Sequence, residues 1–277
     1  MELFKDTCLK CSKLITEAYS TSFTLGIKTL HRKFHEPIYA IYGFVRCADE
    51  IVDTFHDYDK RKLLEEFSHQ TYEAIEQGIS LNPVLHAFQC VVNEYKIDLE
   101  YIEAFLKSMA MDLDDHVYDP ALYKEYIYGS AEVVGLMCLK VFCEGDGEKF
   151  ERLKKPACSL GAAFQKVNFL RDMKSDYKDR GRVYFPAVDI RTFNNASKEE
   201  IEADIAKDFE DAYAGILALP RSARMGVYLA YVYYLKLFRK IKHLPATHIL
   251  NERVRVPDNT KFALLLGSYV RYQLNAI

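Results

Sequence analysis

The sequence predicts an all-α protein folded as a single domain over residues 1–277. Apolar residues recur at three- and four-residue spacing, the period of a helix that buries one face. Strand signals are nearly missing, because no two alternating runs are joined by a hairpin turn. The breaks are short, so we expect no linker between domains. The helical runs are 35–55, 59–77, 100–116, 121–144, 155–177, 198–217 and 221–241.

The overall composition excludes several classes of protein. The chain carries a net charge of −3 and no basic stripe, which argues against a nucleic-acid partner. The amino terminus has no apolar signal region, and the longest apolar stretch, residues 226–238, contains a lysine and is too short to span a bilayer. We therefore expect a cytoplasmic protein that is soluble or peripheral to a membrane. The sequence favours no particular oligomeric state.

The cysteines and glycines carry no recognisable cofactor motif. Seven cysteines without regular spacing do not form a disulfide framework. Cys8 and Cys11 form one CxxC, but a structural zinc site usually needs a second pair, so we expect helix packing. Gly145-Asp146-Gly147 lacks the third glycine and the preceding strand of a dinucleotide fingerprint, and is predicted to end a helix.

A first acidic stripe lies in the segment 37–55. Asp49 and Asp53 are four residues apart and so share one helix face, which runs back through Arg46 to Tyr42. The rest of this helix is largely apolar, with Glu50 the main exception, and a helix apolar nearly all round is normally buried. Buried carboxylates are costly unless a cation meets them. A solvated acidic face is the alternative, and the apolar surroundings argue against it.

A second stripe repeats the pattern in the segment 161–177. Asp172 and Asp176 have the same spacing, and their face runs back through Asn168 to Gln165. The opposite side of this helix carries Arg171, Lys174 and Lys178 and is predicted to face solvent.

Two such faces opposed across a bundle would form a cage of carboxylates. Empty, the four groups would repel one another and their pKa values would rise. Hard divalent cations relieve this, and Mg²⁺ completes its coordination with water and phosphate oxygens. The lack of a nearby His or Cys cluster favours Mg²⁺ over zinc. The sequence therefore predicts a diphosphate substrate. The cations that could hold its oxygens are Arg46, Arg180, Arg182, Arg253, Arg255 and Lys261.

The chain resembles the squalene and phytoene synthases, the head-to-head branch of the isoprenoid synthases, from about residue 8 to about residue 265. The matching motifs are Arg46 to Asp53 (RCADEIVD), Gln165 to Asp176 (QKVNFLRDMKSD) and the Arg180 to Pro186 segment (RGRVYFP). Shorter matches are Ser20-Thr21-Ser22-Phe23, Met111-Asp112-Leu113 and the Tyr126 to Gly135 segment (YIYGSAEVVG). The chain departs from the family at Glu132, in a pocket-lining helix that usually reads AGTVG, and at Tyr19, where some relatives have histidine.

The resemblance implies a helical isoprenoid synthase bundle with a central cavity and two prenyl diphosphate sites. Its metal ligands would be Asp49, Asp53, Asn168, Asp172 and Asp176, holding Mg²⁺ or alternatively Mn²⁺. Its substrate-binding residues would be Ser20, Ser22, Arg46, Gln165, Asn168, Tyr233 and Arg253. Tyr128 and the four aspartates would be catalytic. Tyr228, Tyr231 and Tyr234 compete with Tyr233 for its role.

The implied reaction joins two geranylgeranyl diphosphates to phytoene in carotenoid synthesis, through a cyclopropylcarbinyl diphosphate and without NADPH. The nearest alternative is a squalene or dehydrosqualene synthase that uses farnesyl diphosphate. A terpene cyclase is less expected, because those enzymes commonly carry DDxxD where this chain has Asp49 followed by Glu50. A non-catalytic helical assembly protein would not need both acidic stripes. Because the product would be apolar, we also expect peripheral membrane contact for its release.

Overall fold

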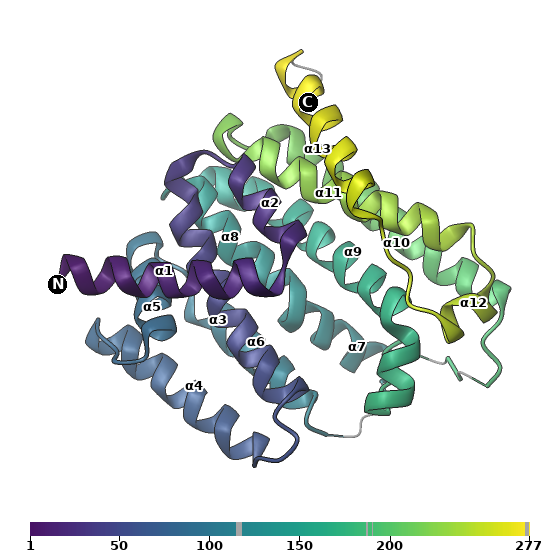
Figure 1. Ribbon diagram of the computed structural model, residues 1–277, viewed down its shortest axis with the longest axis horizontal. Coiled ribbons are helices and arrows are strands. Elements are labelled where there is room, and N and C mark those ends of the chain that lie inside the picture. Colours follow the sequence, from purple (N-terminus) through teal and green to yellow (C-terminus); the bar gives the residue numbers. More distant parts are fainter. Residues whose placement is uncertain (115–117, 187, 190, 275–276) are drawn as a thin grey trace.

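The computed structural model describes residues 1–277 except 115–117, 187, 190, 275 and 276, and leaves the side chains of 178–180, 258, 259, 261 and 262 undescribed. Every regular element in the described part is helical, which confirms the predicted all-α class (Figure 1). The first elements are α1 (Glu2–Tyr19), α2 (Thr21–Thr29), η1 (Arg32–Phe34), α3 (His35–Asp53), α4 (Lys60–Gln77), α5 (Pro83–Tyr95) and α6 (Leu99–Met111). They are followed by α7 (Pro120–Ile127), η2 (Tyr128–Glu132), α8 (Val133–Cys143), α9 (Gly147–Arg180), α10 (Asn195–Ala218), α11 (Arg221–Lys242), α12 (Ala246–Asn251) and α13 (Asp258–Gln273).

Helix starts follow local capping chemistry. Asn82 accepts hydrogen bonds from the backbone N–H groups of Val84 and Leu85, with Pro83 in the first turn of α5. Asp146 caps α9 through Lys149 N–H, directly after a glycine with φ of +88°. The turn predicted at residues 145–147 is thus confirmed, and it makes α8 and α9 an antiparallel pair.

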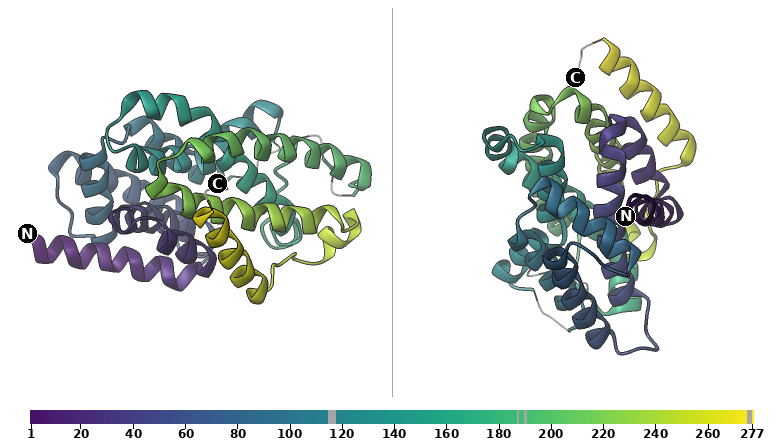
Figure 2. Two further views of the ribbon diagram at one scale, coloured as in Figure 1. Left: turned by 90° about the horizontal axis from the view of Figure 1, so that it is seen from above. Right: turned by 90° about the vertical axis from the view of Figure 1, so that its left-hand side faces the viewer.

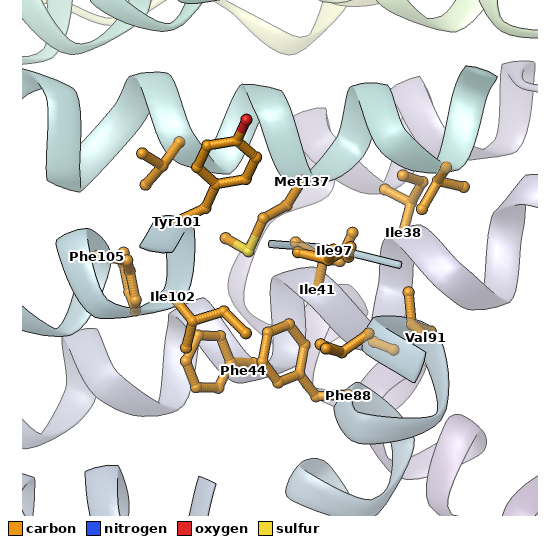
Figure 3. Close-up of a cluster of buried hydrophobic side chains, with 14 of the residues drawn as sticks. Ile38, Ile41, Phe44, Phe88, Val91, Ile97, Tyr101, Ile102, Phe105 and Met137 are labelled. Atoms are coloured by element: carbon orange, nitrogen blue, oxygen red, sulfur yellow. The ribbon is translucent and has the colours of Figure 1, made fainter. Parts of the chain in front are cut away.

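One hydrophobic core lies among α1, α3, α5, α6 and α8. The rings of Phe44 and Phe88 stack with centroids 3.9 Å apart, and Phe105 lies 5.4 Å from Phe44 (Figure 3). All three are fully buried. Such aromatic packing fixes how α3 lies against α5 and α6, and so fixes the direction of the acidic stripe on α3.

A second core lies among α9, α10 and α11 and the chain after α9. Phe169 stacks on Tyr184 at 4.2 Å, and Phe209 packs against Tyr231 and Phe238. Figure 1 shows α9, the longest helix, running across the middle of the molecule beside α8 and α10. The second acidic stripe therefore lies on a central helix with neighbours on several sides.

The segment predicted as one helix over 121–144 is interrupted by a π-helical stretch, η2. Together α7, η2 and α8 (Pro120–Cys143) are long and apolar enough to cross a membrane by length and composition. More than half of the apolar window is buried inside the protein (56%), as in the core helix of a globular fold. The CxxC cysteine Cys8 is also fully buried, on a helix that packs against α5.

Candidate active site

The two aspartate pairs lie at the ends of α3 and α9 and are connected through the chain that follows α9. Asp53 is the last residue of α3, and its Oδ1 accepts a hydrogen bond from Arg182 Nη1 at 3.1 Å. Arg182 follows α9 directly, where its N–H donates to Asp176 O at 2.8 Å. This contact joins the end of α3 to the chain just after α9, as the predicted opposition of the two stripes requires.

Asp112, at the end of α6, anchors this arginine. Arg182 Nη2 donates to Asp112 O at 2.6 Å, and Nη1 lies 3.5 Å from Asp112 Oδ1. The hydroxyl of Tyr126 donates to Asp112 Oδ2 at 2.8 Å, and that of Tyr184 to Oδ1 at 3.1 Å. Two hydrogen bonds and one ion pair thus fix this carboxylate, whose side chain is only 5% exposed. Because such a network holds each member in one orientation, Asp112 sets the position of Arg182 against Asp53.

Burial governs the charge of the acidic cluster. It raises the pKa of Asp49 to about 7, with Arg46 opposing the rise and Asp53 and Asp112 adding to it. Burial likewise raises the pKa of Asp112 to about 6, against the opposing effect of Arg182. Negative charge is therefore disfavoured in this pocket until further cations enter it.

Asp172 is held by two arginines. Arg253 Nε lies 2.7 Å from Asp172 Oδ1, and Arg171 forms an ion pair with the same carboxylate. The prediction that Arg171 faces solvent is wrong, because its side chain is only 21% exposed and turns toward its neighbour in sequence. Asp176, one turn further along α9, is buried and contributes to the raised pKa of Tyr184, which burial dominates.

Arg46 has one partner on its own helix and one on α1. It forms an ion pair with Glu50, one turn along α3, and its guanidinium carbon lies 4.4 Å from the centre of the Tyr19 ring. The position at which some relatives have histidine thus holds a tyrosine that stacks on Arg46. The adjacent Ser20 caps α2 by accepting from Phe23 N–H at 3.2 Å, and it also bonds the Tyr42 side chain.

An apolar cavity of about 290 Å³ runs between α2, α8, α9, α10 and α11. Three polar residues line it, namely Ser22, Ser130 and Gln165, and Gln165 Nε2 donates to Ser130 Oγ at 3.3 Å. Leu153 lies twelve residues before Gln165 on α9, roughly 18 Å along the helix axis. The remaining lining is Phe23, Gly26, Ile27, Leu30, Ile38, Val45, Ala131, Val134, Gly135, Cys138, Leu139, Phe142, Pro156, Ala157, Leu160, Gly161, Phe164, Ala212, Gly215, Ile216, Leu219, Gly226, Val227 and Ala230.

Near Gln165, the next polar residue of the second stripe binds a tyrosine from α11. Tyr234 donates its hydroxyl to Asn168 Oδ1 at 3.3 Å and stacks on Phe164 with ring centroids 4.0 Å apart. Tyr233, the predicted substrate-binding residue, lies edge-on to Tyr234 at 5.6 Å and close to Arg171. Among the competing tyrosines, Tyr234 thus forms a hydrogen bond with the stripe itself.

The structure does not bring Tyr128 to the aspartates. The charged and polar groups around its hydroxyl are Glu100, Cys158, Lys154 and Glu132. Tyr126, two residues earlier, is the tyrosine that joins the acidic cluster. The sequence alone could not separate the two, because a π-helical stretch begins at Tyr128 and shifts which side chains share a face.

Close packing around this π-helical stretch depends on two glycines. A Cβ on Gly129 would lie 2.4 Å from Ala104 O in α6. One on Gly161 would lie 2.7 Å from Ala131 O, so α9 touches the backbone of η2. η2 is therefore held between α6 and α9, beside the cavity and Ser130.

The other predicted cations are Arg180, Arg255 and Lys261. The side chains of Arg180 and Lys261 are outside the described residues. Arg255 is exposed, and its backbone oxygen accepts from Lys240 Nζ. Arg46, Arg182 and Arg253 remain at the aspartates. No role was predicted for Asp112, Tyr126 and Tyr184, although the segments around Asp112 and Tyr184 contain motifs that match the family.

The oxygen-rich donor set suits a hard divalent cation. In the described part of the chain, no group of three or more His, Cys, Asp or Glu side chains is arranged so that it could hold a metal ion. Arginines hold Asp53 and Asp172 instead. Burial, with smaller effects of Asp53 and Asp112, raises the pKa of Asp49, so a cation entering this pocket would favour its charged form, and Asn168 adds an amide oxygen. These carboxylates and amide therefore fit Mg²⁺, which prefers oxygen ligands and shares them with phosphate.

Comparison with known proteins agrees with this geometry. The chain is 27% identical to a phytoene synthase from Arthrospira platensis, over 91% of this chain and 89% of that protein. It is 25% identical to a 4,4′-diapophytoene synthase from Staphylococcus haemolyticus, over 75% and 72% of the two chains. Its fold matches a dehydrosqualene synthase crystal structure with a TM-score of 0.82 at 22% identity, over 99% and 98% of the chains.

Residues 16–260 match the family described as squalene/phytoene synthase. Enzymes of this family are prenyltransferases of isoprenoid and carotenoid biosynthesis and typically use Mg²⁺. This membership favours a head-to-head synthase over the terpene cyclase and the non-catalytic assembly protein. With two opposed aspartate helices beside an apolar cavity, the chain belongs to the squalene/phytoene synthase family and is a head-to-head prenyl condensation enzyme.

Proposed function

We propose that the enzyme joins two geranylgeranyl diphosphates to phytoene, through a cyclopropylcarbinyl diphosphate and with release of diphosphate. The observation that carries this proposal is the apolar cavity with its polar residues Ser22, Ser130 and Gln165, of which Gln165 lies on the same helix as the second aspartate pair. A prenyl chain would occupy the cavity while its diphosphate lies toward the aspartates. Apolar walls also keep water away from the allylic cation.

The diphosphate groups would be bound by residues of both helices. Asp49, Asp53, Asp172 and Asp176, with Asn168, would hold Mg²⁺, and Mn²⁺ is the alternative ion. The metal would supply Lewis-acid stabilisation of the departing diphosphate. Arg46 and Arg253 would bind phosphate oxygens, since each already lies at the acidic stripes. Ser20, Ser22 and Gln165 would add neutral hydrogen bonds.

Aromatic rings would stabilise positive charge on the substrate. Phe23 and Tyr42 stack at 4.7 Å, and the Phe164–Tyr234 pair lies beside Asn168. Ring faces favour cations, most strongly where water is excluded. We assign this role to Tyr234, with Tyr233 as its neighbour. Within the Tyr126-Ile127-Tyr128 segment, the hydrogen bond to Asp112 supports Tyr126 as the functional tyrosine.

The alternative substrate is farnesyl diphosphate, which would give squalene or dehydrosqualene. Relatives acting on either chain length have similar identity to this chain, 27% and 25%. Product analysis distinguishes the two. Purified protein with Mg²⁺ receives geranylgeranyl or farnesyl diphosphate, each with and without NADPH. The proposal predicts a C40 product with a central conjugated triene without reductant, and a C30 product alone would contradict it.

We further propose that the enzyme works in the cytoplasm, peripheral to a membrane. The reason is chemical, because a C40 hydrocarbon has no solubility in water and must pass to a lipid phase. NADPH is not expected, since phytoene formation ends with proton loss and needs no reductant.

A further inference from the structure

The exposed side of α13 carries an unusual concentration of apolar side chains. Leu266 is 59% exposed, Tyr269 53%, Val270 47% and Leu274, at the helix end, 73%. These positions are spaced by three, four and eight residues and so share one face. No other stretch of nine described residues exposes four large hydrophobic side chains. Such a patch on a globular surface usually marks a binding site.

The opposite side of α13 is the one that attaches it to the protein. Arg271 Nη1 donates to Tyr228 OH at 3.2 Å, and Tyr272 OH donates to Arg221 O at 3.2 Å. Ser268 is buried. Figures 1 and 2 show α13 on the outside of the molecule, lying across α11. The apolar face is therefore turned away from the contacts that attach α13, and much of it is presented to the surroundings.

The charges around this face match an anionic surface. α13 contains Lys261 and Arg271, and its one acidic residue is Asp258 at its first position. Arg221, exposed at the start of α11, lies 5.3 Å from the Tyr272 ring. An amphipathic helix bordered by arginines suits the interface of a bilayer with anionic lipids. A second protein copy is less suitable, because two helical turns offer little of the roughly 800 Å² per partner that stable interfaces bury.

The position of α13 connects this face with the cavity. Tyr228 of α11 contacts α13, while Gly226, Val227 and Ala230 of the same helix line the cavity. A Cβ on Gly226 would lie 2.8 Å from Gly26 O, so α11 closes tightly on α2 at this wall. A surface bound by α13 would thus lie one helix away from the cavity.

We propose that the exposed face of α13, formed by Leu266, Tyr269, Val270 and Leu274, docks into the interfacial region of a bilayer containing anionic lipids. Its purpose, transfer of an apolar product, rests on the proposed function. The docking itself rests only on the exposed side chains and their charges.

Vesicle flotation of the full chain tests this proposal. Vesicles of phosphatidylcholine alone and with phosphatidylglycerol are compared for wild type and for Leu266→Ser/Val270→Ser. The matched control is Ile79→Ser/Leu81→Ser, which changes two exposed apolar residues (42% and 91%) in the α4–α5 loop. We expect wild type and control to bind the anionic vesicles and the α13 variant to bind at least tenfold more weakly.

The contribution of positive charge to vesicle binding is tested with a separate variant. Arg271→Gln should weaken binding to the anionic vesicles several-fold and reduce its salt dependence, while thermal melting reports any loss of packing on Tyr228. Equal binding of wild type to both kinds of vesicle would overturn the anionic requirement. Unchanged binding by the α13 variant, or no binding by wild type, would overturn the proposal altogether.

Two further measurements separate the alternatives. If sedimentation shows that wild type is a dimer and the α13 variant a monomer, and wild type does not bind vesicles, the face joins two copies and the lipid proposal is wrong. Diphosphate release from detergent-dispersed substrate should be equal for wild type and the α13 variant. If wild type binds vesicles but releases no diphosphate, the docking stands and the proposed function fails.

Discussion

At the residue scale, the central feature is the carboxylate of Asp112, which binds side chains from several elements. It receives hydrogen bonds from Tyr126 and Tyr184 and holds the arginine that reaches Asp53. The aspartate motifs were predictable from their four-residue spacing. The network around Asp112 was not predictable, because its residues come from α6, α7 and the loop after α9 and meet only in the folded protein.

Replacing Asp112 by asparagine tests that support. The change removes the negative charge that holds Arg182, while the backbone contact at 2.6 Å remains. We expect turnover to fall roughly 10- to 100-fold and the free energy of unfolding to fall by about 1–3 kcal/mol, as for lost hydrogen bonds to charged groups. Steady-state kinetics and urea unfolding measure the two effects. The matched control Asp57→Asn, at an exposed site, should change neither.

The two tyrosines of the Tyr126-Ile127-Tyr128 segment give a paired comparison. Tyr126→Phe deletes a 2.8 Å hydrogen bond to Asp112 and should lower turnover by about tenfold. Tyr128→Phe removes a hydroxyl that faces Glu100 and Cys158, so turnover should stay close to wild type. The reverse ranking in kcat would support the resemblance-based assignment of Tyr128.

At the element scale, contact between α9 and η2 decides how the cavity wall is built. Gly161→Ala would place a methyl group 2.7 Å from Ala131 O, and backbone cannot yield as a side chain can. We expect a loss of about 1–3 kcal/mol in the free energy of unfolding, typical of overpacking. Gly147→Ala, where no atom lies within 4 Å, is the control and should be neutral. Equal melting of both variants would show that η2 adjusts freely.

Several elements could be predicted from apolar periodicity and others could not. The runs at 35–55, 59–77 and 221–241 match α3, α4 and α11 within two residues. The long helix α9 begins eight residues earlier than its predicted run, since Asp146 supplies a cap that periodicity does not reveal. α13 was not predicted, because its outer face is apolar and exposed. The sequence therefore lacks the alternation of apolar and polar faces that is typical of a half-buried helix.

At the scale of the whole molecule, the cavity should control the length of the prenyl chain. Cys138 lines it from α8, so Cys138→Phe would reduce its volume. We expect kcat/KM for geranylgeranyl diphosphate to fall by at least tenfold more than that for farnesyl diphosphate, because the longer chain needs the filled space. Cys138→Ala serves as control and should preserve the ratio. An unchanged ratio in the Phe variant would show that the chain lies elsewhere.

The central claim is that both aspartate helices act on the same substrate. Diphosphate release is the most direct measurement, using wild type, Asp53→Ala and Asp172→Ala with prenyl diphosphate and Mg²⁺. Loss of one charge-stabilising group typically costs roughly 10²–10³-fold in rate. The account predicts a loss of that size in both variants, with cavity and fold intact. A near wild-type rate in either variant would contradict it.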